Sequence, residues 1–286
     1  RSALCEADGI EVAARISQSL ERINNATYIG SGKLTELKEY VDSADIDLVV
    51  FNDELSGSQI RNLEDATGVK IIDRTMLILD IFKDRATSKE GALQVELAML
   101  SYRLPRLTGF GKALSRQGAG IGTRGPGEKR LETDRRHIRK RMDDIKKELA
   151  KAAKVRKTKG SRRNSSGVPV VSLVGYTNSG KSSLMNRLLS MEEREDKQVL
   201  EKDMLFATLD TAQRLITPEE GKSFILIDTV GFVSRLPHTL VDAFKATLEE
   251  VAEADLIIHV ADASFAEKDF HIEVTERVLK ELGAAD

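Results

Sequence analysis

Cysteine, tryptophan and long apolar runs are almost absent from this chain of 286 residues. Cys5 is its one cysteine, so an internal disulfide is excluded and a reducing compartment is indicated. No apolar run approaches the roughly 18 residues of a transmembrane helix. Residues 1–9 also lack the apolar core of a secretory signal. We therefore expect a cytoplasmic protein that needs no membrane.

Negative charge is scarce in one region of the chain. Residues 101–163 contain 21 Lys or Arg and 6 Asp or Glu, although the whole chain has a net charge of −2. A block this basic in an otherwise acidic chain indicates a polyanion partner such as RNA. The alternative is a solvated helical face with a basic linker. Aromatic residues make up only 5% of the chain, so we expect recognition of RNA backbone and shape rather than base stacking.

The length of the chain and its hydrophobic content of 41% predict two or three domains. Residues 1–88 are predicted to form a small α/β domain with a parallel sheet, because strand and helix patterns alternate. The strand-like runs are residues 10–16, 48–51 and 69–72, and the helical patterns are residues 33–43, 56–67 and 75–85. Ser56 is a candidate N-cap and Gly68 a candidate helix stop. Gly30-Ser-Gly32-Lys33 lacks the full spacing of a phosphate loop and is more typical of a turn that opens a helix.

Residues 89–157 are predicted to form a long antiparallel helical hairpin. Its helices are residues 88–105 and residues 127–155, and the second has the spacing of an a/d heptad seam. The apolar positions are Leu93, Leu97, Leu100 and Leu104 in the first helix and Leu131, Ile138, Met142, Ile145, Leu149 and Ala152 in the second. We assign all of them to packing.

A glycine-rich tip loop, residues 118–127, lies between these two helices. It contains five glycines and one proline and is flanked by basic residues. It is either a floppy connector or a tip whose backbone can approach a folded RNA surface, and we favour RNA contact. The predicted RNA-binding residues are Arg116, Gly120, Gly122, Arg124, Gly125, Gly127, Lys129, Arg130, Arg135 and Arg136.

A basic Gly/Ser linker is predicted at residues 158–167, and a P-loop domain at residues 168–286. An apolar strand at residues 170–174 leads into Gly175-x-x-x-x-Gly180-Lys181-Ser182, and a helical pattern follows. The two glycines let the backbone aim N–H groups at a phosphate, and the helix N-terminus adds partial positive charge. Lys181 is placed to reach the outer phosphates, and the hydroxyl of Ser182 to bind Mg²⁺.

Two further segments predict a switch-type NTPase. An apolar strand at residues 224–228 ends in Asp228-x-x-Gly231, where a carboxylate could hold the magnesium shell and an N–H could bond a γ-phosphate. Thr208, in the segment 206–210, could complete the magnesium coordination. The predicted nucleotide-binding residues are Gly175, Tyr176, Thr177, Asn178, Ser179, Gly180, Lys181, Ser182, Ser183, Phe206, Ala207, Thr208, Leu209, Asp210, Asp228, Thr229, Val230 and Gly231. Lys181 and Thr208 are the predicted catalytic residues, and the predicted metal ligands are Ser182, Thr208 and, through water, Asp228.

The apolar pattern predicts the rest of this domain as a strand at residues 256–261 and helices at residues 237–254 and 265–282. His259 lies in that strand, and we expect it to pack rather than to act as a base. The chain ends before an Asn-Lys-x-Asp stretch of the kind that reads guanine. We therefore expect an incomplete domain with weak or absent nucleotide affinity, whose base preference cannot be read directly.

Motifs along nearly the whole chain resemble those of the HflX-type ribosome-associated GTPases, a translation-factor-like class of P-loop protein. They lie at residues 28–34, 73–75, 79–82, 90–97, 104–107, 120–128, 134–136, 175–182, 206–210 and 228–232. The resemblance implies Mg²⁺-dependent GTP hydrolysis to GDP, with Ser182 and Thr208 as magnesium ligands and Asp228 to Gly231 as γ-phosphate sensor. It also implies binding to the large ribosomal subunit and its RNA, with the glycine loop near the peptidyl-transferase region. The implied role is the splitting or rescue of stalled ribosomes under stress, and we expect a monomer.

Phe232 stands where Ras-like enzymes place the glutamine that orients the attacking water. Its ring cannot hydrogen-bond to that water, so we expect slow intrinsic hydrolysis that a partner accelerates. Two alternatives remain for the whole chain. One is an ATP-dependent nucleic-acid remodeller, and the other is a non-catalytic RNA-binding module with a silent nucleotide site.

Overall fold

The computed structural model describes residues 2–107, 126–164, 167–191, 205–206, 211–218, 220–232 and 251–284. The chain divides into two compact units. The first consists of Arg1–Asp80 and Leu97–Ile145, and the second of Ile81–Glu96 and Lys146–Asp286. None of the described helices is long and apolar enough to cross a membrane.

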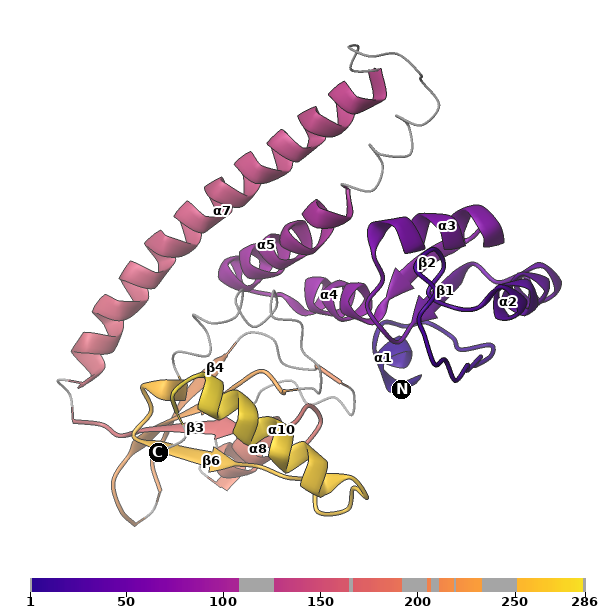
Figure 1. Cartoon of the computed structure of the whole chain (residues 1–286). Coiled ribbons are helices and arrows are strands. Elements are labelled where there is room, and N and C mark those ends of the chain that lie inside the picture. The colour runs from indigo at the N-terminus through magenta and orange to yellow at the C-terminus, as the bar shows by residue number, and fades with distance from the viewer. Residues whose placement is uncertain are drawn as a thin grey trace. The chain divides into compact units, whose positions relative to one another are not determined.

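The first unit contains a two-stranded parallel sheet (Figure 1). Strand β1 (Leu48–Phe51) pairs with β2 (Lys70–Asp73), so that Leu48 faces Lys70 and Phe51 faces Asp73. The accompanying helices are α1 (Ser2–Ala7), α2 (Ser31–Ala44), α3 (Gly57–Thr67) and α4 (Arg74–Arg85). Leu55, Leu63 and Ile71 are buried together between sheet and helices. The predicted α/β domain with a parallel sheet is thereby confirmed.

Local sequence signals fixed the ends of two of these helices. Ser56 caps α3 by accepting a hydrogen bond from the backbone N–H of Gln59, whose side chain in turn accepts from the backbone N–H of Ser56. Gly68 ends the helix with φ of +75°. Helix α2 begins directly after Gly30, as the turn-and-helix interpretation of that segment predicted.

The predicted strand at residues 10–16 is wrong, because these residues have no regular secondary structure. Val12 and Ile16 are 36% and 39% exposed. Ile10, Val12, Ala14 and Ile16 stand at alternate positions, which is the period of a strand with one apolar face. The two-stranded sheet of β1 and β2 does not include this segment, so the alternation by itself did not decide its structure.

The hairpin helices are α5 (Lys89–Arg106) and α7 (Pro126–Asn164). In α7 the predicted seam positions are the less exposed ones among the described side chains, and Ile145 is completely buried. The most buried face of α5 carries Val95, Ala98 and Tyr102, whereas its predicted leucines are only partly buried. Helix α7 runs nine residues past the predicted end and covers most of the expected linker, because Lys and Arg sustain a helix there despite Gly160.

The second unit contains a four-stranded sheet in the order β4-β5-β3-β6. Strands β3 (Val170–Val174), β5 (Phe224–Asp228) and β6 (Leu256–His259) are parallel, and β4 (Ala212–Ile216) runs antiparallel along β5. Strands β3 and β5 have the predicted bounds, and β6 ends two residues before its predicted end. Strand β4 was not predicted, since Gln213 and Arg214 interrupt its apolar pattern.

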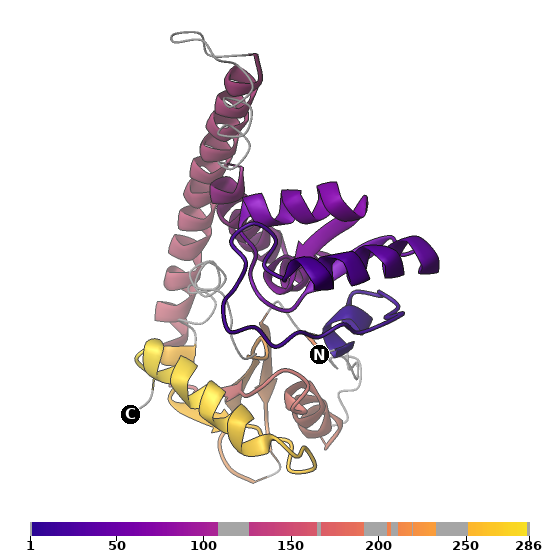
Figure 2. The same ribbon diagram turned by 45° about the vertical axis from the view of Figure 1, so that its right-hand side comes forward.

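Helices α8 (Lys181–Met191) and α10 (Lys268–Glu281) lie on the two sides of this sheet (Figure 2). Met185 and Leu189 of α8 pack against Val171 and Leu173 of β3 and Leu226 of β5. The P-loop strand and the helix that follows it are thus anchored in one core. Helix α10 begins three residues later than predicted, and the predicted helix at residues 237–254 lies almost entirely outside the described residues.

Candidate nucleotide-binding site

Strand β3 and helix α8 are joined by a loop whose backbone requires glycine. Gly175 has φ of +155°, and a Cβ atom there would lie 2.2 Å from the carbonyl oxygen of Val260. Gly180 has φ of +90° and immediately precedes α8. Both values lie in a region that other residues rarely adopt. The predicted strand, glycine loop and helix are therefore present, with the helix N-terminus at the end of the loop.

Lys181 is the first residue of α8, and its side chain turns back to this loop. Its side chain is only 6% exposed, and Nζ donates hydrogen bonds to the carbonyl oxygens of Gly175 (3.2 Å) and Tyr176 (2.8 Å). Burial lowers the pKa of Lys181 to about 8, while the carboxylate of Asp228 acts in the opposite direction. The loop thus holds a buried cation where an anion could approach its N–H groups.

Ser182 and Asp228, predicted from segments 46 residues apart, meet in the structure. Ser182 Oγ donates a hydrogen bond of 2.6 Å to Oδ2 of Asp228, which is completely buried at the end of β5. A hydroxyl and a carboxylate are the hard oxygen donors that Mg²⁺ prefers, so these residues fit the expected ion. The described residues contain no group of three or more His, Cys, Asp or Glu side chains that could hold a metal.

The Asp-x-x-Gly segment is joined to the P-loop by main-chain hydrogen bonds. Phe232 N–H donates to the Gly175 carbonyl (3.0 Å), and Thr177 N–H donates to the Phe232 carbonyl (2.7 Å). A Cβ atom at Gly231 would lie 2.4 Å from the Cα of Thr177, so only glycine allows this approach. The ring of Phe232 is buried. Nothing in the sequence pattern signals this bridge.

Phe206 is the one predicted residue of the 206–210 segment that the structure describes. Its backbone N–H donates a hydrogen bond of 2.7 Å to Oγ1 of Thr177. Its ring meets Phe82 of α4 edge to face, with centroids 4.6 Å apart. Thr208, with Ala207, Leu209 and Asp210, lies outside the described residues. Its predicted roles as magnesium ligand and catalytic residue therefore stay predictions.

Tyr176 forms a second contact that the sequence did not reveal. Its ring stacks on His271 of α10 at 3.6 Å with an interplanar angle of 6°, and Phe265 stacks on His271 at 4.7 Å. Burial lowers the pKa of His271 against the opposing charges of Glu267 and Asp262. His259 ends β6 half-buried, as expected of a packing residue, and burial lowers its pKa too.

Comparisons with known families agree with this organisation. Residues 2–83 match the family described as "GTP-binding GTPase N-terminal", and residues 85–163 match "GTP-binding GTPase Middle Region". Residues 170–284 match "50S ribosome-binding GTPase". The GTPase HflX of Caldanaerobacter subterraneus subsp. tengcongensis is 56% identical over 279 residues, which cover 97% of this chain. The chain belongs to the HflX GTPase family.

Other relatives show the same relationship. The GTPase HflX of Escherichia coli K12 is 44% identical across 98% of this chain. The chain spans 64% of the length of the Caldanaerobacter relative and 65% of the E. coli one. A GTP-binding protein from the archaeon Sulfolobus solfataricus, solved in complex with GDP, is 27% identical with a TM-score of 0.50, and the match covers 98% of this chain and 73% of that one.

The hairpin of this HflX family member holds the predicted RNA-binding residues, half of which lie outside the residues that the structure describes. Arg116, Gly120, Gly122, Arg124 and Gly125 lie outside the described residues, and Gly127, Lys129 and Arg130 lie in the first turns of α7.

The structure describes the side chains of the other two. Arg135 is half-buried, with a guanidinium nitrogen 3.8 Å from Glu132, whereas Arg136 is exposed. The RNA assignment of these residues stays a prediction.

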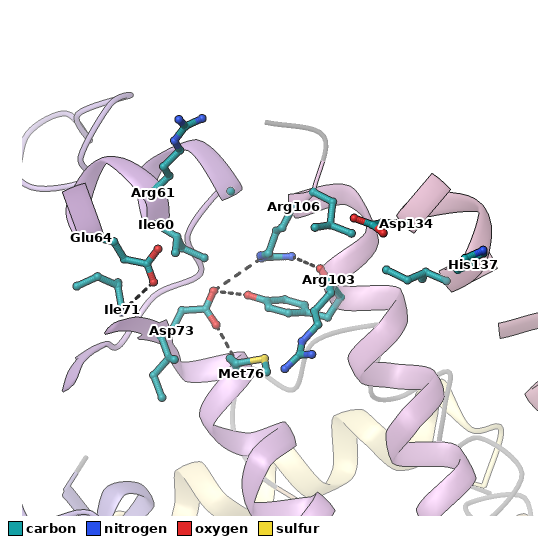
Figure 3. A pocket seen from close by; sticks show the side chains of 15 residues that line it. Ile60, Arg61, Glu64, Ile71, Asp73, Met76, Arg103, Arg106, Asp134 and His137 are labelled. Carbon is teal, nitrogen blue, oxygen red and sulfur yellow. Dashed lines mark hydrogen bonds and ion pairs between the residues drawn. The ribbon is translucent and has the colours of Figure 1, made fainter. Parts of the chain in front are cut away.

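The first unit contains a cavity of 520 Å³ that none of the predicted site residues lines (Figure 3). Its polar centre is Asp73, buried at the end of β2, which accepts hydrogen bonds from the N–H groups of Leu55 (3.0 Å) and Met76 (2.9 Å) and from the Tyr102 hydroxyl. Burial and the bond to Asp73 raise the pKa of Tyr102. Arg106 stacks over the Tyr102 ring, with its Cζ atom 3.3 Å from the ring centroid. Its Nη2 atom lies 3.8 Å from Oδ2 of Asp73.

Proposed function

We propose that this chain is the N-terminal, middle and nucleotide-binding part of a factor that binds and hydrolyses GTP on the large ribosomal subunit. Its role would be to split or rescue stalled ribosomes under stress, as a monomer in the cytoplasm. The observation that carries the proposal is the meeting of Lys181, Ser182 and Asp228 at one glycine loop, in a chain of this family.

Phosphate binding is supported by the loop itself. Gly175 and Gly180 allow the loop to turn back onto the start of α8, where backbone N–H groups and the helix dipole favour an anion. Lys181 would place its ammonium on the outer phosphates. Ser182 and Thr208, with Asp228 through water, would hold Mg²⁺, which would neutralise charge on the phosphates during transfer.

Slow hydrolysis is supported by Phe232. Its ring is 1% exposed and its main chain is bonded to the P-loop, so this residue offers no polar group to orient water. We expect the ribosome to supply that orientation by ordering the switch segments. In a single-turnover assay, hydrolysis should be slow with the protein alone and accelerate when ribosomes are added. Fast hydrolysis without ribosomes would contradict this part of the proposal.

Ribosome binding is supported by charge. The basic block at residues 101–163 includes the end of α5, the glycine loop and nearly all of α7. Phosphate contacts made by Lys and Arg give affinity that falls steeply with salt. Binding to the large subunit should therefore weaken strongly between about 50 and 200 mM salt.

Sedimentation with purified large ribosomal subunits tests the whole proposal. The chain is pelleted without nucleotide, with a non-hydrolysable GTP analogue and with the matching ATP analogue, at two salt concentrations. Pelleting that only the GTP analogue strengthens would support a nucleotide-sensing ribosomal GTPase. Preference for the ATP analogue would favour an ATP-dependent remodeller, and nucleotide-independent pelleting would favour a silent nucleotide site. No pelleting at either salt concentration would refute the ribosomal role.

A further inference from the structure

Thr177 contacts both segments that flank the expected γ-phosphate position. Its Oγ1 accepts the 2.7 Å hydrogen bond from Phe206, and its backbone N–H donates to Phe232. The residue is buried, with 5% of its surface exposed. A P-loop binds phosphate through backbone N–H groups rather than through side chains of this kind. In this structure the hydroxyl binds the backbone of Phe206.

Phe206 is held in an uncommon conformation. Its φ of +57° lies in the left-handed region, which is rare for a bulky residue and persists only where the surroundings impose it. The bond to Thr177 and a ring that is 1% exposed supply that constraint. Backbone strain of this kind is often found in segments that switch between states.

The ring of Phe206 links this segment to α4. It meets Phe82 at 4.6 Å and 77°, and both rings are buried within the second unit. Helix α4 is continuous from Arg74 to Arg85, but its residues up to Asp80 belong to the first unit. A change at Phe206 can therefore reach a helix that the two units share.

We propose that Thr177 is a positioning residue that couples the nucleotide site to α4 through Phe206 and Phe82. The proposal rests on the proposed function, in which Thr208 binds Mg²⁺. Thr208 is two residues from Phe206 in the chain, so an ion that binds Thr208 and the hydrogen bond of Thr177 would act on the same short segment. Coupling of this kind is reciprocal, and the contact of Phe82 therefore biases the preference between GTP and GDP.

Hydrogen exchange in the nucleotide-free chain tests the physical link. The reporters are the amide of Phe206 and the amide of Ala86, which donates to the Phe82 carbonyl at 2.9 Å. Thr177→Val removes the acceptor at nearly constant volume and should speed exchange of both amides roughly tenfold, about the effect of one lost hydrogen bond. Thr177→Ser should restore protection. Thr275→Val removes a buried hydroxyl that bonds only within α10, and it should leave both amides unchanged.

Nucleotide titration tests the consequence. Thr177→Val and Phe82→Leu should each change the ratio of GTP-analogue to GDP affinity by about fivefold. The effect of the double variant on this ratio should be no larger than that of one single substitution, because Thr177 and Phe82 both act through Phe206. Phe270→Leu, which changes an exposed ring of the same unit, is the control.

The outcomes separate the two proposals. Unchanged exchange at Ala86 in Thr177→Val, or additive effects of the two substitutions on the affinity ratio, would overturn the coupling. If the unmodified chain bound neither nucleotide, the weak or absent affinity expected from the sequence would account for it, and the exchange experiment would still decide whether the link exists.

Discussion

Two segments of this chain open a helix with glycines and a lysine, and they lie in different units. In the first unit, Gly30-Ser-Gly32-Lys33 precedes and enters α2. There Lys33 forms an ion pair of 2.7 Å with Glu36 on the same helix, and the side chain of Gln18 accepts the N–H of Gly30. In the second unit, Lys181 is buried and bonds to the carbonyl oxygens of its own loop.

The difference comes from what precedes the glycines. Gly175 follows a parallel strand directly, so the loop lies at the carboxyl edge of the sheet next to Asp228 at the end of β5. Ligands of open α/β sheets bind at that edge. Gly30 follows an irregular segment, and the amide groups of residues 26–30 already have partners in the protein. In this chain, glycines and a lysine therefore form a candidate phosphate site only where they directly follow a parallel strand.

The strongest test of this comparison exchanges the two lysines for alanine. Lys181→Ala should weaken binding of a fluorescent guanine nucleotide about 100-fold, because it removes a charge-assisted contact worth about 3 kcal/mol. Lys33→Ala should change affinity less than about twofold, since only a surface ion pair is lost. Circular dichroism confirms that both variants fold. Equal losses for the two variants would mean that the first loop also binds nucleotide.

The same contrast explains which parts of the fold and of the candidate site could be predicted from the sequence. The bounds of β3 and β5 were correct because buried parallel strands consist of continuous apolar runs. The P-loop and the Ser182–Asp228 pair could be inferred because their spacing is set by phosphate and magnesium chemistry. The edge strand β4 lacked such a pattern and was missed, whereas residues 10–16 have the alternation of a strand but form no regular secondary structure.

Contacts between distant segments could not be predicted at all. Thr177 and Phe206 are 29 residues apart in the chain, and Phe82 comes from a helix that no motif connects to the nucleotide site. Stacking of Tyr176 on His271 likewise depends on how α10 packs beside the loop. Side-chain pairs of this kind follow from tertiary packing, and local propensity does not encode them.

The second test concerns the stability of the loop at Gly175. Gly175→Ala should lower the free energy of unfolding by about 2 kcal/mol or more, because φ of +155° is strained for alanine and the new Cβ would clash with Val260. Chemical denaturation followed by circular dichroism measures the loss. A change below about 0.5 kcal/mol would show that the loop relaxes freely, and that its geometry is not imposed by the sheet.

A third test asks whether the polar centre of the first unit is Asp73 rather than its glycine loop. The pKa of Tyr102 is raised in the folded state. The contribution of Tyr102 to the free energy of unfolding is therefore fully present below the unfolded pKa of about 10, and it falls as the pH rises above that value. The unmodified chain should lose up to about 1.4 kcal/mol per pH unit more than Tyr102→Phe above that pH. Denaturation curves between pH 8 and 11 provide the comparison, with Tyr40→Phe on α2 as control. Parallel curves for all three proteins would contradict this assignment.

The smallest expected effect is that of Gly32→Ala on the free energy of unfolding, and its sign should be opposite to that of Gly175→Ala. A Cβ atom at Gly32 would have no atom within 4 Å, and Gly32 lies inside α2. Gly32→Ala should therefore stabilise the chain by about 0.5–1 kcal/mol, since alanine loses less conformational freedom in a helix. The same substitution at Gly175 is expected to destabilise. If Gly32→Ala were destabilising as well, the first loop would need its glycine for a contact or a conformation of its own, and the contrast between the loops would fail.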